Sequence, residues 1–102
     1  MPAIGFVTCR DATGSRKIAQ VLLEKRLVAC ANIIPKIESQ YWWKGSLSKA
    51  AEALLLIKTR KELREKAMAE IKKLHSYELP IIEFSDSVVS KGAEEWIKKE
   101  TK

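Results

Sequence analysis

The residues best suited to chemistry lie in one short stretch, Leu74 to Pro80, which contains the only histidine of the chain, His75. Tyr77 and Glu78 follow closely, and a phenol or a carboxylate can orient an imidazole or accept a hydrogen bond from it. An imidazole in this setting can be a metal ligand, a general base or a polar group at a helix end. The stretch alone leaves these three roles open.

Two cysteines, Cys9 and Cys30, could add thiolate ligands to the imidazole. Thiolate and imidazole suit Cu(I) and Zn, so copper or another divalent metal is the cofactor to consider. Both cysteines lie in apolar, strand-like sequence without a Cys-x-x-Cys pair, and no signal peptide precedes them. This pattern predicts reduced thiols in a cytoplasmic protein, and it favours small buried side chains over metal ligands.

The elements that must position these residues alternate between strand-like and helix-like patterns. Strand-like runs cover residues 3–9, 28–43, 53–57 and 81–84, and helical apolar spacing covers 12–27, the stretch from Leu63 to Leu74, and 93–99. Pro35 predicts a bulge in the second strand, and Lys44 to Ser46 predicts a hairpin turn after it. Thr59 and Glu62 have the spacing of a capping box, which predicts the start of the second helix.

This order predicts an α+β fold, a ferredoxin-like βαββαβ sandwich with an antiparallel sheet, an extended β-hairpin and a short C-terminal helix. We expect one domain over residues 1–102. Residues 29–34 and 53–57 are nearly apolar at successive positions, so both faces of the sheet should be covered. Helices can cover one face, and partner subunits are expected on the other.

Large aromatic residues cluster at the tip of the expected hairpin. Tyr41, Trp42 and Trp43 could stack on bases, but packing between subunits is the commoner role for such side chains. Lys58 and Arg60 flank the expected helix start, where they could receive an anion or serve as surface charge. The net charge of +6 comes from 19 basic and 13 acidic residues that are interleaved, which is typical of solvated helix faces. No apolar run approaches the roughly 20 residues of a membrane-spanning helix.

Five segments together resemble the CutA family of divalent-cation tolerance proteins: Thr8-Cys9, Arg26 to Pro35, Tyr41 to Gly45, Ile57 to Arg60 and Leu74 to Pro80. The resemblance implies a trimeric ferredoxin-like protein, similar in architecture to PII signalling proteins and linked to copper and divalent-metal tolerance. It also implies metal ligation by Cys9, Cys30 and His75, to which we add Glu78. Arg10 and Ser76 stand where this family usually has proline.

The predicted topology also bears on a shared metal site. We expect Cys9 and Cys30 near the same edge of the sheet, with His75 about 20 Å away at the far end of a four-turn helix. A site that uses all three residues would then need a neighbouring subunit.

The function predicted from these observations is that of a homotrimeric, non-enzymatic protein that binds divalent metal ions. The alternatives are a PII-like sensor of small ligands at subunit clefts and an RNA-binding module. Residues 53–57 lack the aromatic side chains that RNA-binding sheets use for base stacking, which argues against nucleic acid as a partner. His75 or Glu78 could act as a base, but the sequence shows no nucleophile paired with them, so we assign no catalytic residues.

Overall fold

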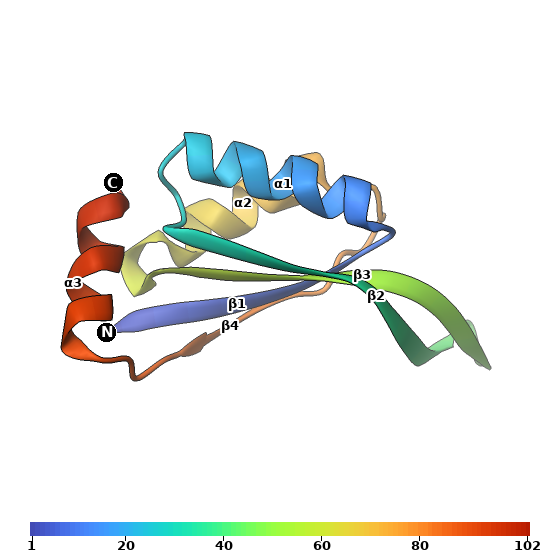
Figure 1. Ribbon diagram of the computed structural model, residues 1–102. Coiled ribbons are helices and arrows are strands. Elements are labelled where there is room, and N and C mark those ends of the chain that lie inside the picture. Colours follow the sequence, from blue (N-terminus) through green and yellow to red (C-terminus); the bar gives the residue numbers. More distant parts are fainter.

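A four-stranded antiparallel sheet is the frame of the computed structural model, which describes residues 1–102. Its strands are β1 (Pro2–Cys9), β2 (Cys30–Trp43), β3 (Ser46–Arg60) and β4 (Ile82–Asp86), in the spatial order β2-β3-β1-β4. The helices are α1 (Ala12–Glu24), α2 (Arg64–Leu74) and α3 (Lys91–Glu100). Both α1 and α2 lie on one face of the sheet, and α3 packs at the end where β1 begins (Figure 1). The predicted ferredoxin-like α+β fold is confirmed. None of the helices combines the length and apolar character that a membrane crossing requires.

Helix α1 begins because Asp11 caps it: its Oδ1 accepts a hydrogen bond from the Gly14 amide at 2.8 Å. Ile18 and Leu22 then turn into the core, one helical turn apart. The helix ends at Glu24, three residues before the end that the apolar pattern predicts. Arg26 adopts a left-handed φ of 59°, so the chain turns there toward β2.

Helix α2 starts later than the capping-box spacing predicts. Thr59 lies in β3 rather than at a helix cap, and its hydroxyl donates to the Leu27 carbonyl at 2.6 Å. A short 3₁₀ turn (η1, Lys61–Leu63) leads into α2 without a side-chain cap. The prediction was wrong because a tertiary partner, which sequence spacing does not show, takes the threonine hydroxyl.

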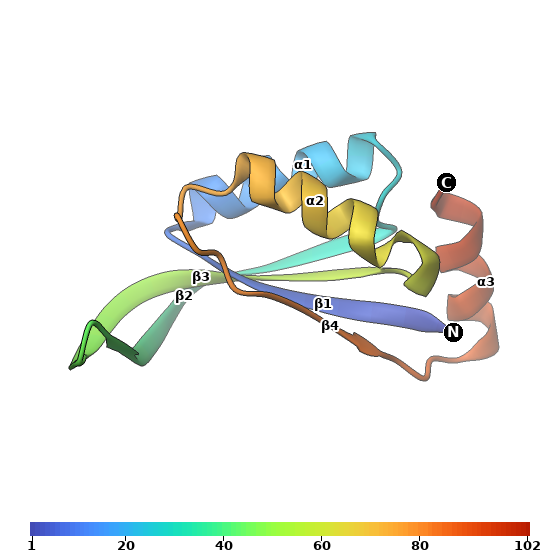
Figure 2. The same ribbon diagram turned by 180° about the vertical axis from the view of Figure 1, so that it is seen from behind.

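The β2–β3 hairpin is longer than predicted, because β3 begins at Ser46 immediately after the turn. Lys44 and Gly45 both have positive φ, 50° and 83°, as a tight hairpin turn requires. The predicted bulge is confirmed by a register shift between Ile34 and Ile37. The hairpin projects beyond the helices and curves away from the sheet (Figures 1 and 2), and the molecule measures 44 Å along its longest axis.

The core lies between the sheet and the two helices. Its largest fully buried side chains come from both layers, including Leu22 of α1, Ile71 of α2 and Leu55 of β3. Burying each such side chain contributes about 1.5–3 kcal/mol. The core therefore fixes the ends of α1 and α2 relative to the end of β1, which is where the candidate site lies.

The opposite face of the sheet also carries a group of apolar side chains, as its sequence predicts. Phe6 of β1 pairs with Leu56 of β3, and Thr8 pairs with Leu54, which in turn faces Ile34 of β2. These side chains point away from the buried row, and no helix covers them (Figure 2). Ile34 is 44% exposed. We call this surface the open face.

Candidate functional site

The stretch Leu74 to Pro80 forms a corner at one end of the sheet. The backbone N–H of His75 makes the last helical hydrogen bond of α2, to the Ile71 carbonyl at 2.9 Å. The chain then crosses from the helical layer to the sheet and enters β4 at Ile82. Because Ile82 pairs with Val7 of β1, this crossing places the His75 side chain beside the end of β1.

The His75 imidazole makes two hydrogen bonds, one with each ring nitrogen. Nε2 lies 2.8 Å from the Thr8 carbonyl oxygen, and Nδ1 accepts from the Tyr77 amide at 3.1 Å. A carbonyl can only accept, so Nε2 carries the proton, and an amide can only donate, so Nδ1 is unprotonated. These partners assign a neutral ring with the Nε2–H tautomer. The ring also stacks at an angle on Tyr77, with centroids 4.8 Å apart.

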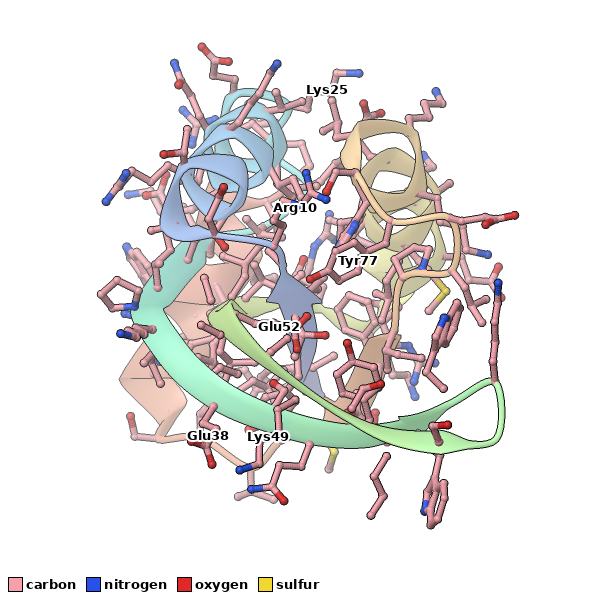
Figure 3. All side chains as sticks on the ribbon, turned by 90° about the vertical axis from the view of Figure 1, so that its right-hand side faces the viewer. Arg10, Lys25, Glu38, Lys49, Glu52 and Tyr77 are labelled. Carbon is pink, nitrogen blue, oxygen red and sulfur yellow. The ribbon has the colours of Figure 1, made fainter.

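Tyr77 also binds Glu52, a residue that was not predicted from the sequence. Its hydroxyl donates to the Glu52 carboxylate at 2.6 Å, within the range of a charge-assisted bond. Burial raises the pKa of the Tyr77 phenol above its ordinary value, the Glu52 bond and charge raise it further, and the Arg10 charge opposes the shift. Figure 3 shows Arg10, Tyr77 and Glu52 grouped between the helix ends and the sheet.

Glu52 is only 8% exposed although it carries a carboxylate. It is the only charged residue in residues 50–57, which otherwise form an apolar run. That lone carboxylate in a strand is the signal that could have identified it, because a buried charge needs a hydrogen-bonding partner. Its partner could not be inferred, since Tyr77 lies 25 residues away along the chain.

Glu78 is exposed. Together with Tyr77 it lines a groove of about 450 Å³ between α2 and the segment that follows the corner. The other lining residues are Met68, Lys72, Leu79, Pro80 and Ile82. Of the two expected companions of His75, the structure brings Tyr77 into contact and leaves Glu78 in this groove.

The two cysteines lie at opposite ends of the sheet, and the prediction that they share an edge is wrong. Cys9 pairs with Ala53 of β3, whereas Cys30 pairs with Lys58 near the other end. The physical reason is that α1 carries the chain back along the sheet before β2 begins. The expected 20 Å separation from the histidine is also wrong for Cys9, because the His75 ring contacts Thr8, the residue next to it.

The environments of the two thiols differ. Cys9 is buried, with its sulfur 3.9 Å from the Val7 carbonyl oxygen. Burial raises the pKa of the Cys9 thiol, which disfavours the thiolate that a metal needs. Cys30 is half-buried on the open face, with its sulfur 3.5 Å from Asn32 Oδ1.

A metal site requires several ligands that converge, and one chain does not provide them. The structure contains no group of three or more His, Cys, Asp or Glu side chains placed to hold an ion. Both ring nitrogens of His75 are engaged, the Cys9 thiol is buried, and Cys30 is at the far end of the sheet. The residues of a single chain therefore do not fit a bound metal.

The remaining predicted site residues are spread over the sheet and its hairpin. Arg60 donates through Nε to the Thr101 hydroxyl at 2.8 Å, so it holds the C-terminal segment rather than facing an anion. Lys58 is half-buried on the open face. Tyr41, Trp42 and Trp43 are exposed near the hairpin tip, and Trp42 is 71% exposed.

This fold and this sequence match one known family. A family model described as the CutA1 divalent ion tolerance protein matches residues 3–100. The chain belongs to the CutA1 family. The divalent-cation tolerance protein CutA of Pyrococcus horikoshii is 35% identical over 100 residues, which cover 97% of each chain. The solved structure of the periplasmic divalent cation tolerance protein CutA of Archaeoglobus fulgidus is 34% identical, with a TM-score of 0.95 over 98% of each chain.

Some CutA relatives are considerably longer. The Danio rerio CutA homolog is 37% identical over 94 residues, which are 91% of this chain and 61% of that protein. Against several animal and plant relatives, the chain spans between 41% and 61% of their length. Two of these relatives, those of Pyrococcus horikoshii and Archaeoglobus fulgidus, are named for tolerance of divalent cations. A relative from Oryza sativa is named as chloroplastic and that of Archaeoglobus fulgidus as periplasmic.

Proposed function

We propose that this CutA1 chain works as a homotrimeric, non-enzymatic binding protein in divalent-cation homeostasis. The observation that carries the proposal is the second apolar face of the sheet, which no element of the chain covers. A stable interface of ordinary size removes about 800 Å² per partner from water. The open face and the long hairpin together offer apolar surface to two neighbours, as a closed ring of three copies requires.

The hairpin supplies surface for the same assembly. Trp42 and Leu47 lie on opposite strands of its tip and are 71% and 70% exposed. Leu79 lines the groove at the corner and is exposed, and Ile81, two residues further along the chain, is exposed as well. A contact between two different patches of identical chains generates a ring when its rotation closes, so the hairpin of one subunit can pack against the corner of the next.

Sedimentation equilibrium tests the assembly, and a trimer has three times the 11.6 kDa mass of the chain. Leu54→Lys places a charge on the open face, and we expect a monomer that retains its far-UV circular dichroism. Leu23→Lys is the matched control, because Leu23 is exposed on α1 and its variant should remain a trimer. A wild-type monomer at micromolar concentration, or a trimeric Leu54→Lys variant, would refute the assembly.

We propose copper or another divalent cation as the ligand, because the family is described by its tolerance of divalent ions. Because one chain lacks a converging ligand set, we place cation binding at subunit boundaries. Of the predicted ligands, Cys30 on the open face and Glu78 in the corner groove are free to meet a neighbouring chain. Calorimetry should show Cu²⁺ or Zn²⁺ binding that Cys30→Ser or Glu78→Gln weakens. Equal heats for the wild type and the double variant would reject cation binding at these residues.

A small-ligand sensor of the PII type is the second candidate, and the corner groove is the observation that favours it. About 450 Å³ is enough for a small metabolite, and the Lys72 ammonium offers donors there. Thermal shift assays with mononucleotides and small carboxylic acids would separate the two functions, since only the sensor responds without metal. For either function we propose a cytoplasmic location, no enzymatic activity, and neither a membrane nor a nucleic acid as partner.

A further inference from the structure

The hydrogen bonds of His75 carry an inference that does not depend on the proposed function. We propose that His75 is closed to metal ions and is instead the positioning residue of the corner. Its neutral imidazole holds the end of β1 with one nitrogen and the segment after α2 with the other, and so sets the Tyr77 hydroxyl on Glu52. A bound cation would then need the same imidazole nitrogens that make the hydrogen bonds of the corner.

Neither nitrogen of the His75 ring has a free lone pair. Nε2 is protonated because its partner is the Thr8 carbonyl oxygen at 2.8 Å. The lone pair of Nδ1 is occupied by the Tyr77 amide at 3.1 Å. A metal binds imidazole through an unprotonated nitrogen, so it must displace the amide or remove the Nε2 proton and the Thr8 contact.

The two hydrogen bonds of the His75 ring fix the position of Tyr77. The amide of Tyr77 is anchored to the ring of His75, and the two rings lie 4.8 Å apart. This anchoring aims the phenol at Glu52, whose buried carboxylate has no other hydrogen-bonding partner. Loss of the imidazole contacts therefore releases Tyr77 and leaves a buried carboxylate without its donor.

No nearby group would complete a metal site around the His75 ring if its hydrogen bonds were broken. The thiol closest along β1, that of Cys9, is buried and hydrogen-bonded inside the core. Glu52 is committed to Tyr77, and Arg10 places a positive charge close to that pair. A cation that displaced the hydrogen bonds of the corner would find one nitrogen of His75, the Cys9 thiol, which resists deprotonation, and the Arg10 guanidinium.

Nitrogen NMR of the intact wild-type protein tests the proposal without a substitution. Long-range ¹H–¹⁵N spectra should show His75 as the neutral Nε2–H tautomer, unchanged when ZnCl₂ is added in tenfold excess. The proposal is overturned by a Nδ1–H tautomer. It is overturned equally by Zn²⁺-dependent shifts of the ring nitrogens while the Tyr77 amide resonance stays in place. A protein that binds no Zn²⁺ at all would reject the metal-binding function and leave the tautomer result to decide this proposal.

Variants test the positioning role separately. His75→Leu should raise the hydrogen-exchange rate of the Tyr77 amide at least tenfold while Zn²⁺ affinity by calorimetry stays within twofold. His75→Gln offers an amide that can both donate and accept, and it should restore part of the protection. Ser76 is the exposed neighbour of His75, and Ser76→Ala is the control. It should change neither the exchange rate of the Tyr77 amide nor the Zn²⁺ affinity. Unchanged exchange in His75→Leu, or a tenfold loss of Zn²⁺ affinity, would refute the assignment.

Discussion

The hydrogen bond between Tyr77 and Glu52 should contribute measurably to stability, and Tyr77→Phe removes it alone. The hydroxyl oxygen lies 2.6 Å from Glu52 Oε2, and Glu52 is 8% exposed. Phenylalanine keeps the ring that packs on His75. Hydrogen bonds to charged groups contribute about 1.5–3 kcal/mol, and a buried acceptor left without its donor loses that amount. We therefore expect the free energy of unfolding to fall by about 2 kcal/mol.

Guanidinium chloride unfolding at one fixed protein concentration measures this change, because assembly makes apparent stability concentration-dependent. A double-mutant cycle with Glu52→Gln isolates the pair, and we expect a coupling energy of about 0.5–3 kcal/mol. Tyr41→Phe is the matched control, since Tyr41 is exposed on the hairpin, and it should stay within about 0.5 kcal/mol of the wild type. Additive single-variant effects would refute the reasoning.

The same bond predicts a loss of stability at alkaline pH. Burial and Glu52 raise the pKa of Tyr77 in the folded protein, whereas the unfolded phenol titrates near pH 10, at roughly its reference value. The contribution is then fully present below about pH 10 and is lost as pH rises toward the folded pKa, because the unfolded chain gives up the proton first. Tyr77→Phe should flatten the decline in stability above about pH 10. An identical decline in the variant would contradict the assigned cause.

Three further changes test other parts of the fold. Gly5→Ala should lower the free energy of unfolding by about 1–3 kcal/mol, because its Cβ would lie 2.7 Å from Phe84 Cε1; a neutral effect in chemical denaturation would contradict this packing. Lys44→Asn should raise the free energy of unfolding by up to about 1 kcal/mol, because asparagine tolerates the left-handed φ of 50° at this position. A lower midpoint of thermal unfolding would contradict this expectation. Cys30 should react with a thiol reagent faster in the Leu54→Lys variant than in the wild-type protein, which we propose to be a trimer, whereas Cys9 should react only on unfolding. Rapid labelling of native Cys9 would show that its burial is wrong.

The sequence predicts most of the fold because most of its signals are local. Alternating and helical apolar patterns gave the order of strands and helices, Pro35 gave the bulge, and Lys44-Gly45 gave the turn. The unusual apolar character of both strand faces predicted the open face. The start of α2 was missed because the Thr59 hydroxyl binds the Leu27 carbonyl, a contact between residues that no spacing rule relates.

The candidate site was predicted in part, and the error has a geometric origin. His75 and Tyr77 were correctly paired because they are neighbours along the chain. Cys30 was placed with Cys9 because the return path of α1 was not followed, and that path puts the start of β2 at the start of β1. Glu52 was missed for another reason: a carboxylate in a strand indicates a hidden partner without indicating which residue provides it.

The corner lets stability and assembly be measured apart, because Tyr77 uses different atoms for each. Its hydroxyl binds Glu52, and the residue also lines the groove in which we propose that a neighbouring hairpin packs. Tyr77→Phe should therefore lower the free energy of unfolding and leave the sedimentation mass unchanged. Tyr77→Ala removes the ring as well, so it should weaken both. If Tyr77→Phe dissociated the trimer as readily as Tyr77→Ala, the hydroxyl would have to act at the interface, and the Glu52 bond would not be its main role.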